Sequence, residues 1–377
     1  MNLFSETENS LNFPTDYNTI LDRINTINPI KYAKTRNFIN GDVTYLSPYI
    51  SRGIISSKQV MEIVLAKGYK PYEIEKFLQE LAWRDYFQRV LQEKGNSIWD
   101  DLKQEQPDVK HNKMIEAVAK ANTGIDAIDN KIKELYETGY MHNHLRMYVA
   151  SITCNMAKAH WRLPATWLYY HLLDGDIASN NCSWQWTAAS FSSKKYYFDQ
   201  ANVNKYTGSN QRKSFIDKTY EEIADMEIPQ SLKVTIDLDL QTVLPKTDFP
   251  IIDYSKPTLI YSSYNLDNQW RKAEDANKIL LLEPSHFQKY PVSEKVFQFI
   301  IDLSKNIDGI QIFVGEFTEL HKIFETNPNA KIIFKEHPLF THYKGIKDER
   351  DWMFPAVTGY YNSFFSFWKK CERYLKK

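Results

Sequence analysis

The hydrophobic pattern of this chain changes once, and that change limits the architectures open to it. From about residue 57 to about residue 190, apolar residues recur every three or four positions, which predicts helices nearly throughout. Segment 199–256 loses this periodicity and carries several prolines, so we interpret it as a linker crossing between domains. Beyond it, short apolar runs alternate with helical stretches, which is typical of buried parallel strands in an α/β sheet.

We therefore expect two domains, which suits a chain of 377 residues. The first is an all-helical domain over residues 1–235, and the second is a smaller Rossmann-like α/β domain over residues 236–377. The expected strands lie in PTLIYSSYN, NKILLLEP, GIQIFVGEF and AKIIFKEHP, and VSEKVFQFIIDLSKNI is an expected helix between two of them. Neither GxGxxG nor GxxxxGK[ST] occurs, which argues against a typical dinucleotide dehydrogenase and a P-loop kinase.

Charge and cysteine content exclude several classes of protein. Lys and Arg number 47, as do Asp and Glu, so no global field attracts nucleic acid or anionic membrane, and DNA binding would need a local patch. The three cysteines lie far apart without a CxxC pair, which argues against a disulfide framework, a structural zinc or a four-cysteine cluster. The N-terminal segment lacks a signal pattern, and no apolar run is long enough to span a bilayer. We expect a cytoplasmic monomer with no membrane contact and no metal.

The segment DGDIASNNCSWQW, residues 174–186, is unusually rich in acids, amides and indoles. If a helix begins near Asp176, then Asp176, Asn180 and Trp184 share one face, and Trp186 points to nearly the opposite side. The simpler interpretation is a capping acid followed by core tryptophans. The combined acid, amide and indole favour a helix that serves two different sites.

Two other helical segments place polar and aromatic residues at matching intervals. In ELAWRDYF, Glu80 and Trp83 share a face, and Arg84 follows Glu80 by one turn, so the ordinary interpretation is an exposed Glu80–Arg84 ion pair. In TGYMHNHLRMYVAS, Asn143 and Met147 are four apart.

The same segment places His142 and Arg146 four residues apart, and a lone polar residue at either position would ordinarily be a satisfied core or surface group. His142 and His144 are two apart, which is wrong for two metal ligands on one helix, and there is no HExxH. This spacing supports the expectation of no metal site.

Four segments, VTYLSPYISRGIISSKQ, ELAWRDYF, TGYMHNHLRM and LLDGDIASNNCSWQW, together resemble successive motifs of the FAD-binding helical domain of the photolyase/cryptochrome family. The resemblance covers residues 32 to about 206 and is closest to cyclobutane pyrimidine dimer photolyases. It implies FAD as cofactor, UV-damaged DNA as partner, and a deoxyribodipyrimidine photolyase, a carbon–carbon lyase driven by electron transfer from excited reduced FAD. Two alternatives stay open: a cryptochrome-like photosensor that signals to a protein partner without repair, and a helical scaffold that has lost the flavin.

The resemblance also implies roles for individual residues. The residues that match the FAD-binding positions are Tyr32, Thr44, Tyr45, Leu46, Ser47, Arg84, Asp174, Gly175, Asp176 and Asn180. Those that match the catalytic and lesion-holding positions are Glu80, Trp83, Asn143, Met147, Asn180 and Trp186. Trp184 and Trp161 match the inner and middle members of an electron-transfer chain, and the DNA contacts implied are Arg36, Glu80, Trp83, Asn143, His144 and Trp186.

The chain departs from the family pattern at several places. The region DLKQEQPDVKHN has no tryptophan to match the outer electron donor, and Trp99 is the nearest substitute. An asparagine-containing turn of the family reads ANV at residues 201–203, and His144 stands where an arginine often contacts DNA. The α/β domain follows the flavin domain here, whereas family members place it first. The resemblance leaves open whether this domain binds a second chromophore.

Overall fold

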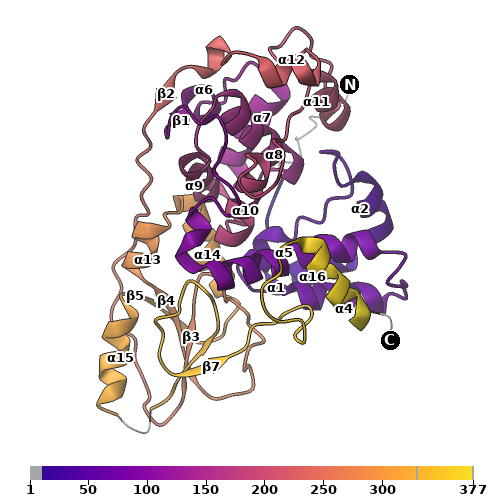
Figure 1. Cartoon of the computed structure of the whole chain (residues 1–377). Coiled ribbons are helices and arrows are strands. Elements are labelled where there is room, and N and C mark those ends of the chain that lie inside the picture. The colour runs from indigo at the N-terminus through magenta and orange to yellow at the C-terminus, as the bar shows by residue number, and fades with distance from the viewer. Residues whose placement is uncertain (1–10, 328–329, 376–377) are drawn as a thin grey trace, which may run out of the picture.

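The computed structural model describes residues 11–327 and 330–375. Its first part is built from helices (Figure 1). They are α1 (Tyr17–Asn25), α2 (Pro29–Thr35), α3 (Ser47–Ser51), α4 (Ser57–Ala66), α5 (Glu75–Lys94), η1 (Gly95–Trp99), α6 (Glu116–Ala119), α7 (Asp126–Thr138), α8 (Asn143–Ser151), the π-helical η2 (Ile152–Met156), α9 (Arg162–His171), α10 (Ile177–Thr187), α11 (Gln200–Thr207), α12 (Tyr220–Asp225) and the short η3 (Gln230–Leu232). Among these residues, no helix is both long and apolar enough to cross a bilayer.

Two features of this first part differ from expectation. It is not purely helical, because β1 (Met114–Ile115) pairs antiparallel with β2 (Thr235–Ile236), and strands of two residues leave no periodic signal in a sequence. Segment 199–256 is a linker only in its later half, since α11 and α12 lie in the earlier half. Helix α11 forms because Asp199 caps its first turn and Val203 is buried, and it ends at Gly208 with a φ of 70°.

The second part contains a five-stranded parallel sheet. Its strands are β3 (Thr258–Tyr261), β4 (Asn277–Leu282), β5 (Ile310–Val314), β6 (Ile332–Lys335) and β7 (Ile346–Asp348), in the order β5-β4-β3-β6-β7. The four strands expected from short apolar runs are confirmed as β3, β4, β5 and β6. Strand β3 and most of β4 are buried on both faces, which explains their apolar sequences. Helices α13 (Pro284–Lys289), α14 (Glu294–Ser304) and α15 (Phe317–Glu325) connect them, and α14 confirms the expected helix.

The order of strands reverses between β3 and β6, so a crevice forms beyond the carboxyl ends of these two strands. The segments that follow β3 and β6 face α4 and α5 of the helical part, and residues from both parts line the space between them. The sheet therefore presents its polar edge to the helices rather than to solvent.

The last helix, α16 (Phe364–Cys371), leaves the sheet and returns to the helical part, where it packs across α5 (Figure 1). A short turn, η4 (Glu372–Tyr374), follows it. Its buried side chains are Phe364, Phe367, Trp368 and Cys371, and the Trp368 indole donates to Glu75 at 3.0 Å. Residues 364–371 therefore pack on α5 of the helical part rather than on the sheet.

Candidate functional site

Helix α10 presents its two indoles in different environments. Trp184 is 2% exposed and Trp186 is 43% exposed, two residues apart on one helix. The carboxylate of Asp176 caps α10 by accepting from the Ser179 amide at 2.7 Å, so the expected helix start is confirmed. One face of α10 is therefore part of the interior, and the other meets solvent.

The two acids that precede α10 are both buried and have different partners. Arg146 donates to both carboxylate oxygens of Asp174, at 2.9 and 3.0 Å. Burial would raise the pKa of Asp174, but the Arg146 charge and further hydrogen bonds hold that pKa below its usual value. Asp176 accepts a second hydrogen bond from the amide of Gln88 on α5. The sequence analysis did not identify Arg146 as a partner of Asp174, nor Gln88 as a partner of Asp176.

His142 and Arg146 are each satisfied by other partners, although they lie four residues apart. Arg146 turns toward Asp174 instead, and the His142 ring accepts from the His144 amide at the start of α8. Burial lowers the pKa of His142 to about 4, so its ring is neutral near pH 7. A buried carboxylate is a stronger partner for a guanidinium than a neutral imidazole is.

The prediction of a Glu80–Arg84 ion pair is wrong. Arg84 donates to the Ser51 hydroxyl at 2.8 Å, and that hydroxyl donates in turn to the backbone carbonyl of Asp174 at 2.9 Å. The Glu80 carboxylate instead pairs with Lys76 at 2.8 Å and with Arg36 at 3.3 Å. Arg84 thus links α5 to the segment that carries the buried acids.

A cavity of about 270 Å³ lies beside the segment before α3 and is lined by residues that include Arg23, Asn28, Thr44 and Tyr45. Tyr45 has a φ of 53°, and its carbonyl accepts from the Arg23 guanidinium at 3.4 Å. Leu46 precedes α3 as its capping residue, and Ser47 begins the helix. Hydroxyls beside a guanidinium form a donor set that suits a phosphate or diphosphate.

The remaining residues expected to bind FAD are spread over three elements. Tyr32 on α2 packs edge to face on Phe77 at 5.3 Å. A Cβ on Gly175 would lie 3.0 Å from the carbonyl oxygens of Tyr169 and Leu172, so the turn before α10 leaves little room for a side chain. Asn180 donates from Nδ2 to the Ala165 carbonyl at 2.9 Å, which directs its own carbonyl oxygen away from that contact.

These groups fit a flavin dinucleotide. Arg23 and the Thr44 hydroxyl, which line the cavity, would hold its diphosphate, and the amide oxygen of Asn180 would accept a hydrogen bond from a ring N–H. Three buried polar atoms of α10, the Ser179 and Thr187 hydroxyls and the Trp184 indole nitrogen, have no hydrogen-bond partner among the described residues. Such groups are costly to bury without a partner, which favours a polar ligand against this helix.

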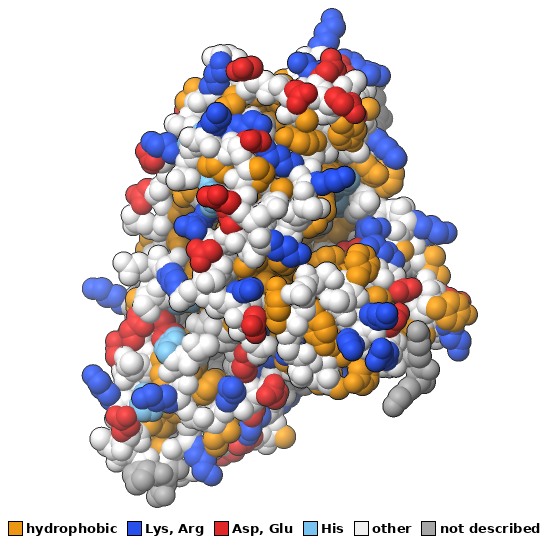
Figure 2. All heavy atoms as spheres, viewed as in Figure 1, with side chains coloured by type: hydrophobic (Ala, Val, Ile, Leu, Met, Phe, Trp, Pro, Cys, Tyr) orange, Lys and Arg blue, Asp and Glu red, His pale blue; other side chains and the backbone are white. Residues whose placement is uncertain are grey.

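The surface has a hollow beside helices that carry residues expected to hold a lesion. Figure 2 shows this hollow between α8 and α11 above and α2, α5 and α16 below. Glu80 and Trp83 come from α5, the exposed Asn143 and half-buried Met147 from α8, and Trp186 from α10.

Trp83 has a partner that the sequence did not reveal. The ring of Phe364 on α16 stacks on its indole with centroids 3.8 Å apart and planes 9° apart. The two residues are 281 positions apart in the chain, so helical periodicity carries no signal of this contact.

Two residues expected to contact DNA are engaged within the protein. Arg36 pairs with Glu80 and also donates to the Ala33 carbonyl at 2.9 Å. His144 is 9% exposed, and its ring lies 3.0 Å from the Asn37 carbonyl oxygen. Burial lowers the pKa of His144, so this ring adds no positive charge at neutral pH.

A column of aromatic rings extends from the helical part into the sheet part. The rings of Trp161 and Trp99 are stacked with centroids 6.2 Å apart, and Trp99 and Tyr290 are stacked at 6.1 Å. The buried Trp161 indole donates to Asp101 at 2.7 Å. Tyr290 directly follows α13, so the two parts of the chain meet through this column.

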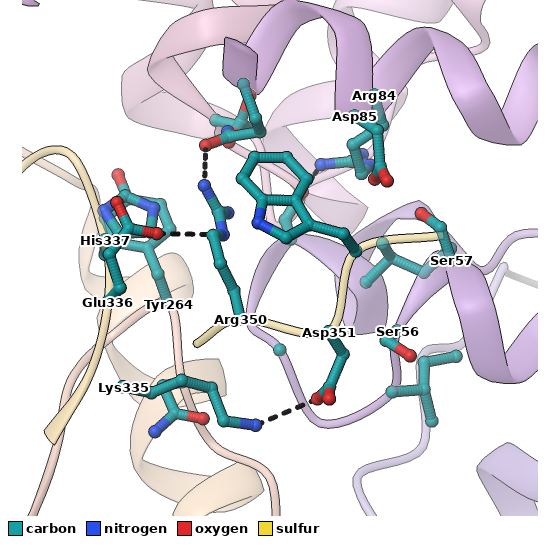
Figure 3. Close-up of a pocket in the computed structure, with 18 residues that line it drawn as sticks. Ser56, Ser57, Arg84, Asp85, Tyr264, Lys335, Glu336, His337, Arg350 and Asp351 are labelled. Carbon is teal, nitrogen blue, oxygen red and sulfur yellow. Dashed lines mark hydrogen bonds and ion pairs between the residues drawn. The ribbon is translucent and has the colours of Figure 1, made fainter. Parts of the chain in front are cut away.

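The crevice between the two parts is small and polar, with a volume of about 90 Å³ (Figure 3). Within it, Arg350 donates to the side-chain amide oxygen of Gln88 at 2.8 Å, and Lys335 pairs with Asp351 at 3.0 Å. Asp85 accepts from the Met353 amide at 2.7 Å. Burial raises the pKa of Asp85 to about 6. Arg350, Gln88 and Asp176 therefore form one continuous chain of hydrogen bonds from the sheet part to the start of α10.

No group of three or more His, Cys, Asp or Glu side chains is arranged to hold a metal ion within residues 11–327 and 330–375.

Comparisons with known proteins match this helical part. Residues 77–255 match a family model described as the FAD binding domain of DNA photolyase. The chain is 34% identical over 170 residues to a cryptochrome DASH from Danio rerio, a match that covers 42% of this chain and 32% of that protein. It is 28% identical over 204 residues to a deoxyribodipyrimidine photo-lyase from Salmonella typhimurium, covering 49% of this chain and 42% of that protein. The chain thus spans less than half the length of these relatives.

Among solved structures, a cryptochrome from Synechocystis sp. PCC6803 is similar with a TM-score of 0.47 and 24% sequence identity. The similarity covers 52% of this chain and 44% of that chain.

Proposed function

Because the helical part of this chain belongs to the photolyase/cryptochrome family, with FAD as its cofactor, we propose that the protein uses light to repair cyclobutane pyrimidine dimers in DNA. The observation that supports the proposal is the exposure of Trp186, which is 43% exposed on α10 while Trp184 on the same helix is buried. Glu80, Trp83, Asn143, Met147 and Trp186 come from three helices, and the family resemblance assigns all of them to the lesion.

In this proposal the chain's own residues bind and orient the lesion. A pyrimidine dimer that is flipped out of the duplex loses its stacking and needs aromatic surface, which Trp83 and the exposed Trp186 offer. The Asn143 amide can both donate to and accept from pyrimidine edges. The Glu80 carboxyl can share a proton with a carbonyl oxygen of the dimer once its ion pairs loosen. Reduced FAD, when bound, would supply the light-driven electron transfer that ring opening requires.

Blue-light illumination of the reduced, FAD-loaded protein with dimer-containing DNA tests the proposal. We expect loss of dimers under light and none in the dark, measured by chromatography of the digested DNA. Dimers that persist under light in the presence of bound FAD would refute the proposal.

The second candidate is a cryptochrome-like photosensor without repair activity. The observations that favour it are the two ion pairs of Glu80, the burial of His144, and the covering of one Trp83 face by Phe364. A sensor should bind damaged and undamaged duplexes equally. A clear preference for damaged DNA would therefore count against it.

A further inference from the structure

We infer that helix α16, which lies outside the matched flavin-binding domain, forms part of the DNA-binding face beside the lesion site. The inference rests on the proposed function, because it names an additional surface for the same DNA. It starts from a deficit of charge: Arg36 is paired with Glu80, and His144 is buried and neutral. Neutralisation of phosphates supplies much of the affinity of DNA-binding proteins, so other cations must flank the hollow.

The position of α16 is fixed by its buried face. Phe364 stacks on Trp83, and Trp368 donates to Glu75 at the start of α5. Phe364 also lies 5.9 Å from the Tyr86 ring, with planes 78° apart. The helix is therefore held on α5 next to an indole expected to touch the lesion, and Figure 1 shows that it lies along the edge of the helical part.

The opposite face of α16 is cationic and partly aromatic. Lys369 and Lys370 are exposed, and Arg373 follows on the adjoining turn. Phe365 and Lys369 are four apart on α16 and therefore share one outward face. Basic side chains gather over this part of the surface, below the hollow of Figure 2.

Phe365 is 68% exposed and lies at the end of α16 that is nearest Trp83, since its ring is 5.5 Å from that of Phe364. An exposed aromatic ring beside two lysines is the combination that binds nucleic acid strands, with the ring stacking on a base and the cations on phosphates. A DNA strand that enters the hollow would thus pass over Phe365 and then Lys369 and Lys370.

Fluorescence anisotropy with a duplex carrying one thymine dimer tests this inference across a series of salt concentrations. The variant Lys369→Glu/Lys370→Glu should bind at least ~10-fold more weakly, and its log–log salt slope should fall by about 2. Phe365→Ser should weaken binding with an unchanged salt slope. The control Lys322→Glu/Lys331→Glu makes the same charge change on exposed lysines of the sheet part, one on α15 and one directly before β6.

The outcomes separate the two proposals. If the wild type repairs dimers and the α16 lysine variant binds DNA as tightly as the wild type, the inference is overturned and the proposed function stands. If DNA binding depends on these lysines but no repair occurs under light, the inference is supported and the repair function fails. A wild-type protein that binds no DNA overturns both proposals.

Discussion

At the scale of single residues, the family resemblance implies a role for each site residue, and the structure shows which side chains it contacts. Asp176 is a helix cap and also the end of a hydrogen-bond chain through Gln88 to Arg350. A buried carboxylate needs such donors, because each missing partner leaves charge unsolvated. The sequence located the acid correctly, but the residues that hold it lie 88 positions before it and 174 positions after it.

The variant Gln88→Met tests whether this chain prepares the flavin site. It keeps the side-chain length and removes the donor to Asp176. We therefore expect FAD to bind roughly 10-fold more weakly, which is the effect of losing one hydrogen bond to a charged group. Titration of the apoprotein by flavin fluorescence measures the dissociation constant. Gln79→Met, also on α5 but hydrogen-bonded to Glu75, is the matched control. An unchanged affinity in Gln88→Met would show that Asp176 does not depend on this donor.

Trp186→Ala separates the two sides of α10. Because Trp186 is exposed and Trp184 is buried, the substitution should lower the affinity for dimer-containing DNA by ~1–3 kcal/mol, a typical stacking contribution, and leave FAD bound. Anisotropy and the flavin absorption spectrum measure the two properties in the same sample. Tyr254→Ala, another exposed aromatic, should change neither. Loss of flavin from Trp186→Ala would mean that this indole faces the cofactor.

At the scale of elements, the sequence predicted the helices and strands whose pattern of apolar residues is local. The apolar runs that form β3, β4 and β6 are mostly buried because both faces of a parallel sheet are covered, and the run of the edge strand β5 is mostly half-buried. All four strands were evident from these runs in the sequence. Strand β7 has exposed Ile346 and Lys347 and follows no such rule. The packing of α16 on α5, and the Trp99 column, depend on contacts between distant segments, which periodicity does not encode.

The Trp99 column predicts a route for electrons toward bound flavin. If Trp184 and Trp161 act as the family resemblance implies, Trp99 is the next ring in line, since it stacks on Trp161. Trp99→Phe should then slow photoreduction of oxidised bound FAD at least several-fold, followed by absorbance under blue light with a thiol reductant. Repair by chemically reduced protein should be unaffected. Trp167→Phe, a buried indole that packs on Tyr136, is the control, and equal rates in both variants would exclude this route.

At the scale of the whole molecule, the helical and sheet parts are joined by one continuous hydrophobic core. Residues from α5, α14 and α16 belong to the same buried cluster, and the crevice between the parts is crossed by hydrogen bonds of Arg350 and Asp85. Unfolding of either part should therefore expose groups of both. Buried histidines make this coupling dependent on pH.

His286 is the clearest of these groups, because it is buried among aromatic rings at the junction of the two parts. Burial lowers its pKa to about 4, whereas the unfolded chain has a value near 6.5, so the stability it contributes is complete above pH 6.5 and is lost as pH falls toward 4. As the pH falls from 7.5 to 5, this group alone should lower the free energy of unfolding by about 2 kcal/mol. His286→Phe, which keeps an aromatic ring and removes the titrating group, should lose correspondingly less over that interval in urea unfolding. An equal loss in wild type and variant would place the acid sensitivity at other residues.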